Sequence, residues 1–193
     1  MFRQEIEADV RETRSVIERD LAASREYAAR IRAILGAMAA PDAGRDSVLA
    51  TVGGAFLLKK WEPVNDTYQE ALASGRVSLL DDAELRLALS RYHSQIAHVG
   101  GYVDWIGDAY YGQHEPWLVA NTDYSEIGYD AYRNELVGGP FRTDFDALAR
   151  SRELWNLLTL RLELELGFQG ALGLLDERAA AVLGALDGVS EGE

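Results

Sequence analysis

Apolar side chains recur every three or four positions from residue 2 to residue 39, and no proline or glycine interrupts this pattern before Gly36. The spacing is typical of one apolar stripe along an α-helix. A helix of this length would extend about 55 Å, and an apolar face that long cannot remain in water. The sequence therefore predicts a long helix that needs a long partner. Its stripe consists of Phe2, Ile6, Val10, Ile17, Leu21, Ala28, Ile31, Leu35 and Met38.

The other end of the chain has a similar pattern. Thr143 is a suitable N-cap, and Asp146 follows three residues later, so a second long helix is predicted from Thr143 to about Leu186. We expect this helix to pack antiparallel against the first one. Its apolar positions are Leu148, Trp155, Leu158, Leu162, Leu166, Leu172, Leu175, Val182 and Leu186.

A third long helix is predicted between these two, over residues 82–111. Asp81 is its expected N-cap, with Glu84 three residues on. Residues 112–142 are rich in Gly, Pro, Asn and Asp, so we interpret them as a long loop with one short helix near 124–136.

The predicted fold class follows from these elements. It is an all-α helical bundle with long N- and C-terminal amphipathic helices packed antiparallel, a long central helix, and short helices between them. We expect a single helical domain over residues 1–187 and a disordered tail over residues 188–193.

Composition and charge exclude several classes of function. The 193-residue chain has a net charge of −13 and no cluster of basic residues, which disfavours nucleic acid as a partner and anionic lipid as a surface. It has no cysteine and no run of 18 apolar residues, so we expect no thiol-based metal site and no direct membrane insertion in this chain. His93 and His98 are five residues apart, about 140° around a helix, and do not share a face. We therefore expect no metal and no cofactor.

No catalytic motif is present, and we expect no enzyme activity. The sequence lacks GxxxxGK[ST], GxGxxG, GxSxG and HExxH patterns. Aromatic residues do gather between residues 92 and 124, and aromatic rings with polar tips suit a ligand pocket or a protein interface. The same pattern is also typical of an ordinary core under a long loop. The candidate residues for binding a ligand or partner are Trp61, Tyr68, Arg76, Tyr92, His93, Trp105 and Asp108.

Residues 61–92 resemble the central motif of a bacterial helical family of unknown function. Members of that family have a Pro-x-Asn-x-Thr-Tyr segment, a Ser-Gly-x-x-x-Leu-Ile segment and a Leu-Arg helix that ends in Tyr, and the preceding helix has Glu-x-Asp-x-Arg-x-Thr near its start. They usually carry one transmembrane helix before that first helix. The resemblance implies a helical domain beside a membrane, with no known reaction and no known catalytic residues. The matching residues here are Trp61-Glu62-Pro63-Val64-Asn65-Asp66-Thr67-Tyr68, Ala73-Ser74-Gly75-Arg76-Val77-Ser78-Leu79-Leu80-Asp81-Asp82, Glu84-Leu85-Arg86 and Tyr92.

Three functions remain open from the sequence. The first is a non-enzymatic helical domain that senses a ligand or holds a protein partner, including a second copy of itself, in the extracytoplasmic part of a single-span bacterial membrane protein. The second is a small-molecule-binding protein or enzyme that uses the aromatic cluster at 92–117, with Tyr92, His93, Trp105 and Asp108 as its residues. The third is an accessory subunit of a larger complex.

Overall fold

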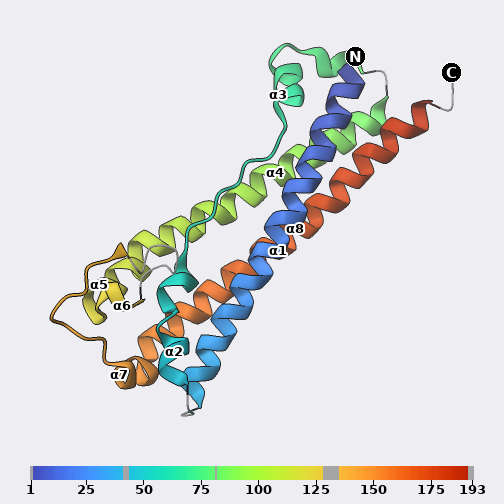
Figure 1. Ribbon diagram of the computed structural model, residues 1–193. Helices are drawn as coiled ribbons and strands as arrows, with labels where there is room; N and C mark the ends of the chain where they lie inside the picture. The colour runs from blue at the N-terminus through green and yellow to red at the C-terminus, as the bar shows by residue number, and fades with distance from the viewer. Residues whose placement is uncertain (1, 41–43, 81, 128–134, 191–193) are drawn as a thin grey trace. The chain divides into compact units, whose positions relative to one another are not determined.

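The structure of the chain, a computed structural model, describes residues 2–40, 44–80, 82–127 and 135–190 (Figure 1). No strand occurs among these residues. Three long helices dominate: α1 (Phe2–Ala39), α4 (Ala83–Ala109) and α8 (Arg152–Ser190). The predicted all-α bundle is therefore confirmed. The shorter elements are α2 (Arg45–Leu49), η1 (Val52–Phe56), α3 (Asp66–Ala73), η2 (Arg76–Leu79), η3 (Tyr110–His114), α5 (Glu115–Asn121), α6 (Tyr124–Ile127) and α7 (Phe145–Arg150).

The chain divides into two compact units, and the division falls within each of the three long helices. Unit 1 contains Met1–Ala23, Lys60–Tyr102 and Phe168–Glu193, and unit 2 contains Ser24–Lys59 and Val103–Gly167. The single domain predicted for residues 1–187 stays a prediction. Among the described residues, no helix is both long enough and apolar enough to cross a membrane.

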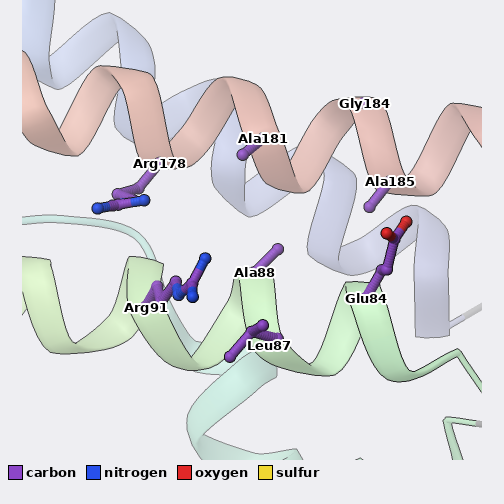
Figure 2. A pocket seen from close by; sticks show the side chains of 8 residues that line it. All are labelled: Glu84, Leu87, Ala88, Arg91, Arg178, Ala181, Gly184 and Ala185. Atoms are coloured by element: carbon purple, nitrogen blue, oxygen red, sulfur yellow. The ribbon is translucent and has the colours of Figure 1, made fainter.

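Unit 1 is a bundle of the first part of α1, most of α4 and the last part of α8. The Arg14 Nε donates to Asp176 Oδ1 at 2.7 Å and joins α1 to α8, and the Gln95 side-chain amide donates to the Ala171 carbonyl at 2.9 Å and joins α4 to α8. Figure 2 shows α4 and α8 running side by side. The core of this unit includes Ile6, Val10, Ile17, Leu85, Leu89, Tyr92, Val99, Phe168, Leu172, Leu175 and Val182.

Two polar residues of α1 hold the segment that precedes α3. The Thr13 hydroxyl donates to the Val64 carbonyl at 2.8 Å and accepts from the Val64 N–H at 3.0 Å, and Asp9 Oδ2 accepts from the Thr67 N–H at 3.0 Å. Asn65, the N-cap residue of α3, makes no side-chain cap. Asp9 therefore satisfies a helix-terminal N–H from a different helix. Asp9 and Thr13 are the third and last positions of the Glu-x-Asp-x-Arg-x-Thr pattern. This pattern therefore contacts the Pro-x-Asn-x-Thr-Tyr segment, which comes later in the chain.

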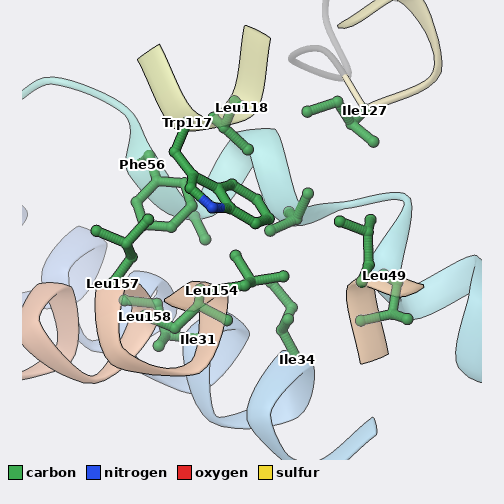
Figure 3. Close-up of a cluster of buried hydrophobic side chains, with 13 residues drawn as sticks. Ile31, Ile34, Leu49, Phe56, Trp117, Leu118, Ile127, Leu154, Leu157 and Leu158 are labelled. Atoms are coloured by element: carbon green, nitrogen blue, oxygen red, sulfur yellow. The ribbon is translucent and has the colours of Figure 1, made fainter. Parts of the chain in front are cut away.

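Unit 2 has an apolar core to which α1, η1, α5 and α8 contribute (Figure 3). Its α1 and α8 segments run antiparallel, because Ser24 contacts Glu165 while Ile34 shares the core with Leu154. The predicted antiparallel packing of the two long helices is therefore confirmed. Fully buried side chains in this core include Ile31, Ile34, Leu49, Val52, Phe56, Ile127, Leu154 and Leu158.

The prediction of a long loop over residues 112–142 is wrong for its first part. The π-helical turn η3 follows α4 directly, and α5 and α6 come next. Gly112 and Pro116 were the apparent helix breakers. Pro116 lies in the first turn of α5, where its missing N–H costs little, and Gly112 lies inside the π-turn. The predicted helix near 124–136 corresponds to α6, and its residues 128–134 lie outside the described residues.

Helix ends differ from the predictions by a few residues. Asp144, rather than Thr143, caps α7 by accepting from the Ala147 N–H at 2.9 Å, and the predicted last helix breaks at Ser151 before α8. Asp81 lies outside the described residues, while Asp82 accepts from the Glu84 and Leu85 N–H groups at the start of α4. The helix α8 continues to Ser190, three residues into the predicted tail, and residues 191–193 lie outside the described part.

The buried stripe of α8 differs from the predicted one at two apolar and two charged positions. Trp155 is 40% exposed and Leu166 is 45% exposed, whereas Arg161 and Glu165 are fully buried. The buried residues instead follow the spacing of Leu154, Leu158, Arg161, Glu165 and Phe168.

Candidate functional site

Five of the seven predicted site residues belong to unit 1, where they serve several different purposes. Tyr68 and Tyr92 are in the core at 6% and 2% exposure. The Tyr68 and His93 rings lie 5.3 Å apart, and His93 contacts the Gln69 amide at 3.2 Å. Trp61 lies against the backbone of α4 at Gly100, where an added Cβ would be 3.9 Å from the indole.

Arg76, the fifth of these residues, is exposed at the start of η2. Its guanidinium lies 3.7 Å from Glu70 and covers the Phe2 ring at 5.7 Å. These contacts tie η2 to α3 and α1, and they leave Arg76 with a structural role in the described part of unit 1.

Tyr92 is the predicted residue with the most altered acidity. Burial raises the pKa of its phenol to about 12, because the charged phenolate would lose its hydration. Tyr92 is therefore a neutral core residue at physiological pH and is unsuited to act as a general base.

Trp105 and Asp108, the other two predicted residues, belong to unit 2. Both are exposed on α4, and Trp105 is 52% exposed. Within unit 2 neither residue contributes to the buried core described above. Among the described residues, no three His, Cys, Asp or Glu side chains are grouped so as to hold a metal ion.

A groove that sequence analysis did not predict lies between α4 and α8 in unit 1 (Figure 2). It has a volume of about 330 Å³. Arg91 and Arg178 face each other at one end, and Glu84 lies beside Ala185 at the other. Leu87, Ala88, Ala181 and Gly184 also line the groove.

Among the described residues, the side chains of Glu84, Arg91 and Arg178 make no ion pair and no hydrogen bond. Leu87, between the two charged ends, is 52% exposed. Within the described residues, the groove thus combines a half-exposed leucine with three charged side chains that have no partner there.

The floor of the groove is made of small residues. Gly184 is within α8, has an ordinary helical backbone, and an added Cβ there would meet nothing within 4 Å. Glycine costs a helix roughly 0.5–1 kcal/mol relative to alanine. Nothing in unit 1 therefore requires glycine at this position.

Unit 2 contains a buried cluster of charged side chains, which sequence analysis also missed. Glu165 accepts from Arg161 Nη2 at 2.6 Å and from the Ser24 hydroxyl at 2.5 Å. Lys59 Nζ lies 3.0 Å from Oε2 of the same carboxylate. Arg161 also donates to the Leu57 carbonyl at 2.9 Å, and Lys59 lies over the Tyr27 ring at 4.9 Å. One carboxylate thus holds two buried cations.

Burial in this cluster changes the acidity of Arg161. Burial lowers the pKa of Arg161 from its usual value, and the Glu165 carboxylate opposes that shift. Its Nε and Nη1 atoms are buried and have no hydrogen-bond partner among the described residues. Arginine nevertheless stays charged in proteins, so the cluster depends on Glu165 for its only negative charge.

His114 lies close to the same cluster, in the π-turn η3. It is fully buried, and its ring stacks on Phe56 with the centroids 4.4 Å apart. Burial, and secondly the charge of Arg161, lower its pKa to about 4, while the Leu157 backbone opposes the shift slightly. His114 is therefore neutral at physiological pH and behaves as a core aromatic residue.

The chain matches no protein-family model, no curated protein and no solved structure.

Proposed function

We propose that this chain is a non-enzymatic helical domain that holds a protein partner, in a scaffold or sensory role. The observation that carries this proposal is the groove of unit 1, where exposed Leu87 lies between Glu84 and the arginines Arg91 and Arg178, three side chains with no partner in the part of the chain that the structure describes. The neutral Tyr92 and the inward-facing Glu165 support a structural rather than a catalytic role for the buried polar residues.

The resemblance of residues 61–92 to a bacterial helical family supports a second part of the proposal. By that resemblance, the domain belongs to a single-span membrane protein and lies outside the cytoplasm. The gene sequence upstream of the Met1 codon tests this part directly. An apolar segment there, in the same reading frame, would support it, and a stop codon immediately upstream would count against it.

Co-purification with a surface variant tests the interaction role. We expect Leu87→Lys to remove a specific partner that the unchanged chain retains, because a lysine in the middle of the groove would place a third cation beside Arg91 and Arg178. Leu72→Lys is the matched control, since Leu72 is 43% exposed on α3 and outside the groove. Equal retention of every protein by all three chains would contradict an interaction role for this groove.

A further inference from the structure

We infer that the groove between α4 and α8 binds a second copy of this chain in an antiparallel, two-fold symmetric arrangement. The inference rests on the proposed interaction role and names its partner. Two features of the described residues support it: the order of charges and the shape of the groove.

The charges along the groove are self-complementary. Glu84 and Arg91 are seven residues apart on α4, about 10 Å or two helical turns, so both lie on the groove side. Arg178 of α8 adds a second cation at the Arg91 end. In a two-fold interface each end of the patch meets the opposite end of its copy. Glu84 of one chain would then meet Arg91 and Arg178 of the other, and this contact would occur twice.

The two-fold arrangement also places a carboxylate between the two arginines. They face each other at one end of the groove, and no carboxylate among the described residues pairs with either of them. Adjacent like charges repel, and a carboxylate placed between two guanidinium groups removes that repulsion and accepts directed hydrogen bonds. The Glu84 side chain of a second copy is such a carboxylate.

The shape of the groove fits the same arrangement. Leu87 is the one large apolar side chain that lines it, and the remaining apolar positions are Ala88, Ala181, Gly184 and Ala185. A protruding leucine and a floor of small residues form a knob and a hole on the same surface. The same two-fold places Leu87, midway between positions 84 and 91, beside Leu87 and Ala88 of the other chain, which buries both leucines.

The net charge of −13 weakens the association of two copies. Two copies repel each other at long range, and salt at physiological strength limits that repulsion to about 8 Å. The local ion pairs and the leucine contact must offset what remains. We therefore expect a reversible dimer rather than an obligate one.

Charge reversal of the two ends of the groove tests the inference. Glu84→Arg makes the groove entirely positive, and Arg91→Glu with Arg178→Glu makes it entirely negative. Sedimentation equilibrium of the unchanged chain should show a monomer–dimer equilibrium, and each charge-reversed chain should bind itself at least about tenfold more weakly. An equimolar mixture of the two variants should regain association as a one-to-one heterodimer, because every end then meets its opposite charge.

The mixture also controls for misfolding, because two misfolded variants would not regain association when they are combined. Far-UV circular dichroism confirms that each variant is helical, and Glu12→Arg, an exposed reversal on α1, is the matched control that should leave association unchanged. Self-association that persists in both charge-reversed chains, or fails to return in the mixture, would overturn the inference. An unchanged chain that stays monomeric at submillimolar concentration would also overturn it. In that case a different protein retained through Leu87 would still support the proposed interaction role.

Discussion

Glu165 is the residue on which the buried polar cluster of unit 2 depends most. It is fully buried and contacts Arg161, Lys59 and Ser24 at 2.5–3.0 Å. A buried ion pair adds little stability compared with apolar residues of similar size, but removal of one partner leaves an uncompensated buried charge. The cluster therefore fixes how these side chains pack more than it adds to the free energy of unfolding.

We expect Glu165→Gln to lower the free energy of unfolding by about 3 kcal/mol, because Arg161 and Lys59 would stay buried without a carboxylate. Urea unfolding followed by circular dichroism measures this change. Glu163→Gln, an exposed change two residues away on α8, should stay within about 0.5 kcal/mol of the unchanged chain. The triple change Lys59→Met, Arg161→Met and Glu165→Leu should cost less than Glu165→Gln alone. Equal effects of Glu165→Gln and Glu163→Gln would contradict the buried cluster.

His114 makes the stability of the fold depend on pH in a defined window. Its pKa is about 4 in the folded chain and about 6.5 when unfolded, so the unfolded chain binds the extra proton first as pH falls. The stabilisation is complete above pH 6.5 and decreases as pH falls toward 4. We expect a loss of about 2 kcal/mol between pH 7 and pH 5 from this residue alone.

A comparison of the unchanged chain with His114→Phe at the two pH values isolates this effect. The variant keeps an aromatic ring beside Phe56 and has no proton to bind, so its stability should fall less over this pH range. His98→Gln, at an exposed position of α4, should keep the full pH dependence. If His114→Phe and the unchanged chain lose the same stability, His114 is not buried in the neutral form.

At the scale of single elements, α1 contributes polar contacts as well as its apolar stripe. Thr13 is fully buried and exchanges two hydrogen bonds with the backbone of Val64, and Asp9 accepts from the Thr67 N–H. These bonds fix the extended segment before α3 on the surface of a helix more than fifty positions earlier in the chain. The Pro-x-Asn-x-Thr-Tyr segment therefore has a structural explanation within unit 1.

Thr13→Val tests this docking. Valine has nearly the same shape as threonine but leaves the Val64 N–H and carbonyl without a partner, so we expect a loss of about 2 kcal/mol. Thr159→Val is the matched control, because the Thr159 hydroxyl is exposed and donates only to the carbonyl one turn earlier. Urea denaturation of both variants gives the comparison. A loss for Thr13→Val no larger than that for Thr159→Val would show that segment 64–67 does not depend on α1.

At the scale of the whole molecule, the long helices connect the two units through the chain itself. Each of α1, α4 and α8 contributes residues to both units. Loss of helix in one unit removes the support for the continuation of the same helix in the other. We therefore expect the single domain predicted from the sequence to appear as one cooperative unfolding transition.

Tryptophan fluorescence can separate the two units in this experiment. Trp61 belongs to unit 1, and the other tryptophans, at positions 105, 117 and 155, belong to unit 2. In the variant Trp61→Phe, fluorescence reports on unit 2 while far-UV circular dichroism reports on all helices. We expect the same urea midpoint from both probes. A second circular dichroism transition without a fluorescence change would indicate two independently folding domains.

Local patterns in the sequence determined the helices of this protein and the pairing of the longest two. A repeat of three to four residues is a property of the chain itself, so Ile6, Val10, Ile17 and Ile31 could be assigned to one buried stripe without knowledge of any partner. The same reasoning failed at residues 112–121, where the Gly and Pro content of the segment predicted a loop although a π-turn accommodates Gly112 and a helix start accommodates Pro116.

Only the tertiary structure decided which polar residues are buried and where the groove of unit 1 lies. No local pattern predicts that Arg161 and Glu165 are buried, because an isolated charge avoids the interior, whereas the fold brings Lys59 and Ser24 from distant positions to pair with Glu165. The groove of Glu84, Arg91 and Arg178 likewise joins two helices that are remote in sequence. The groove was missed because it is formed by side chains from two helices, and no local pattern encodes that contact.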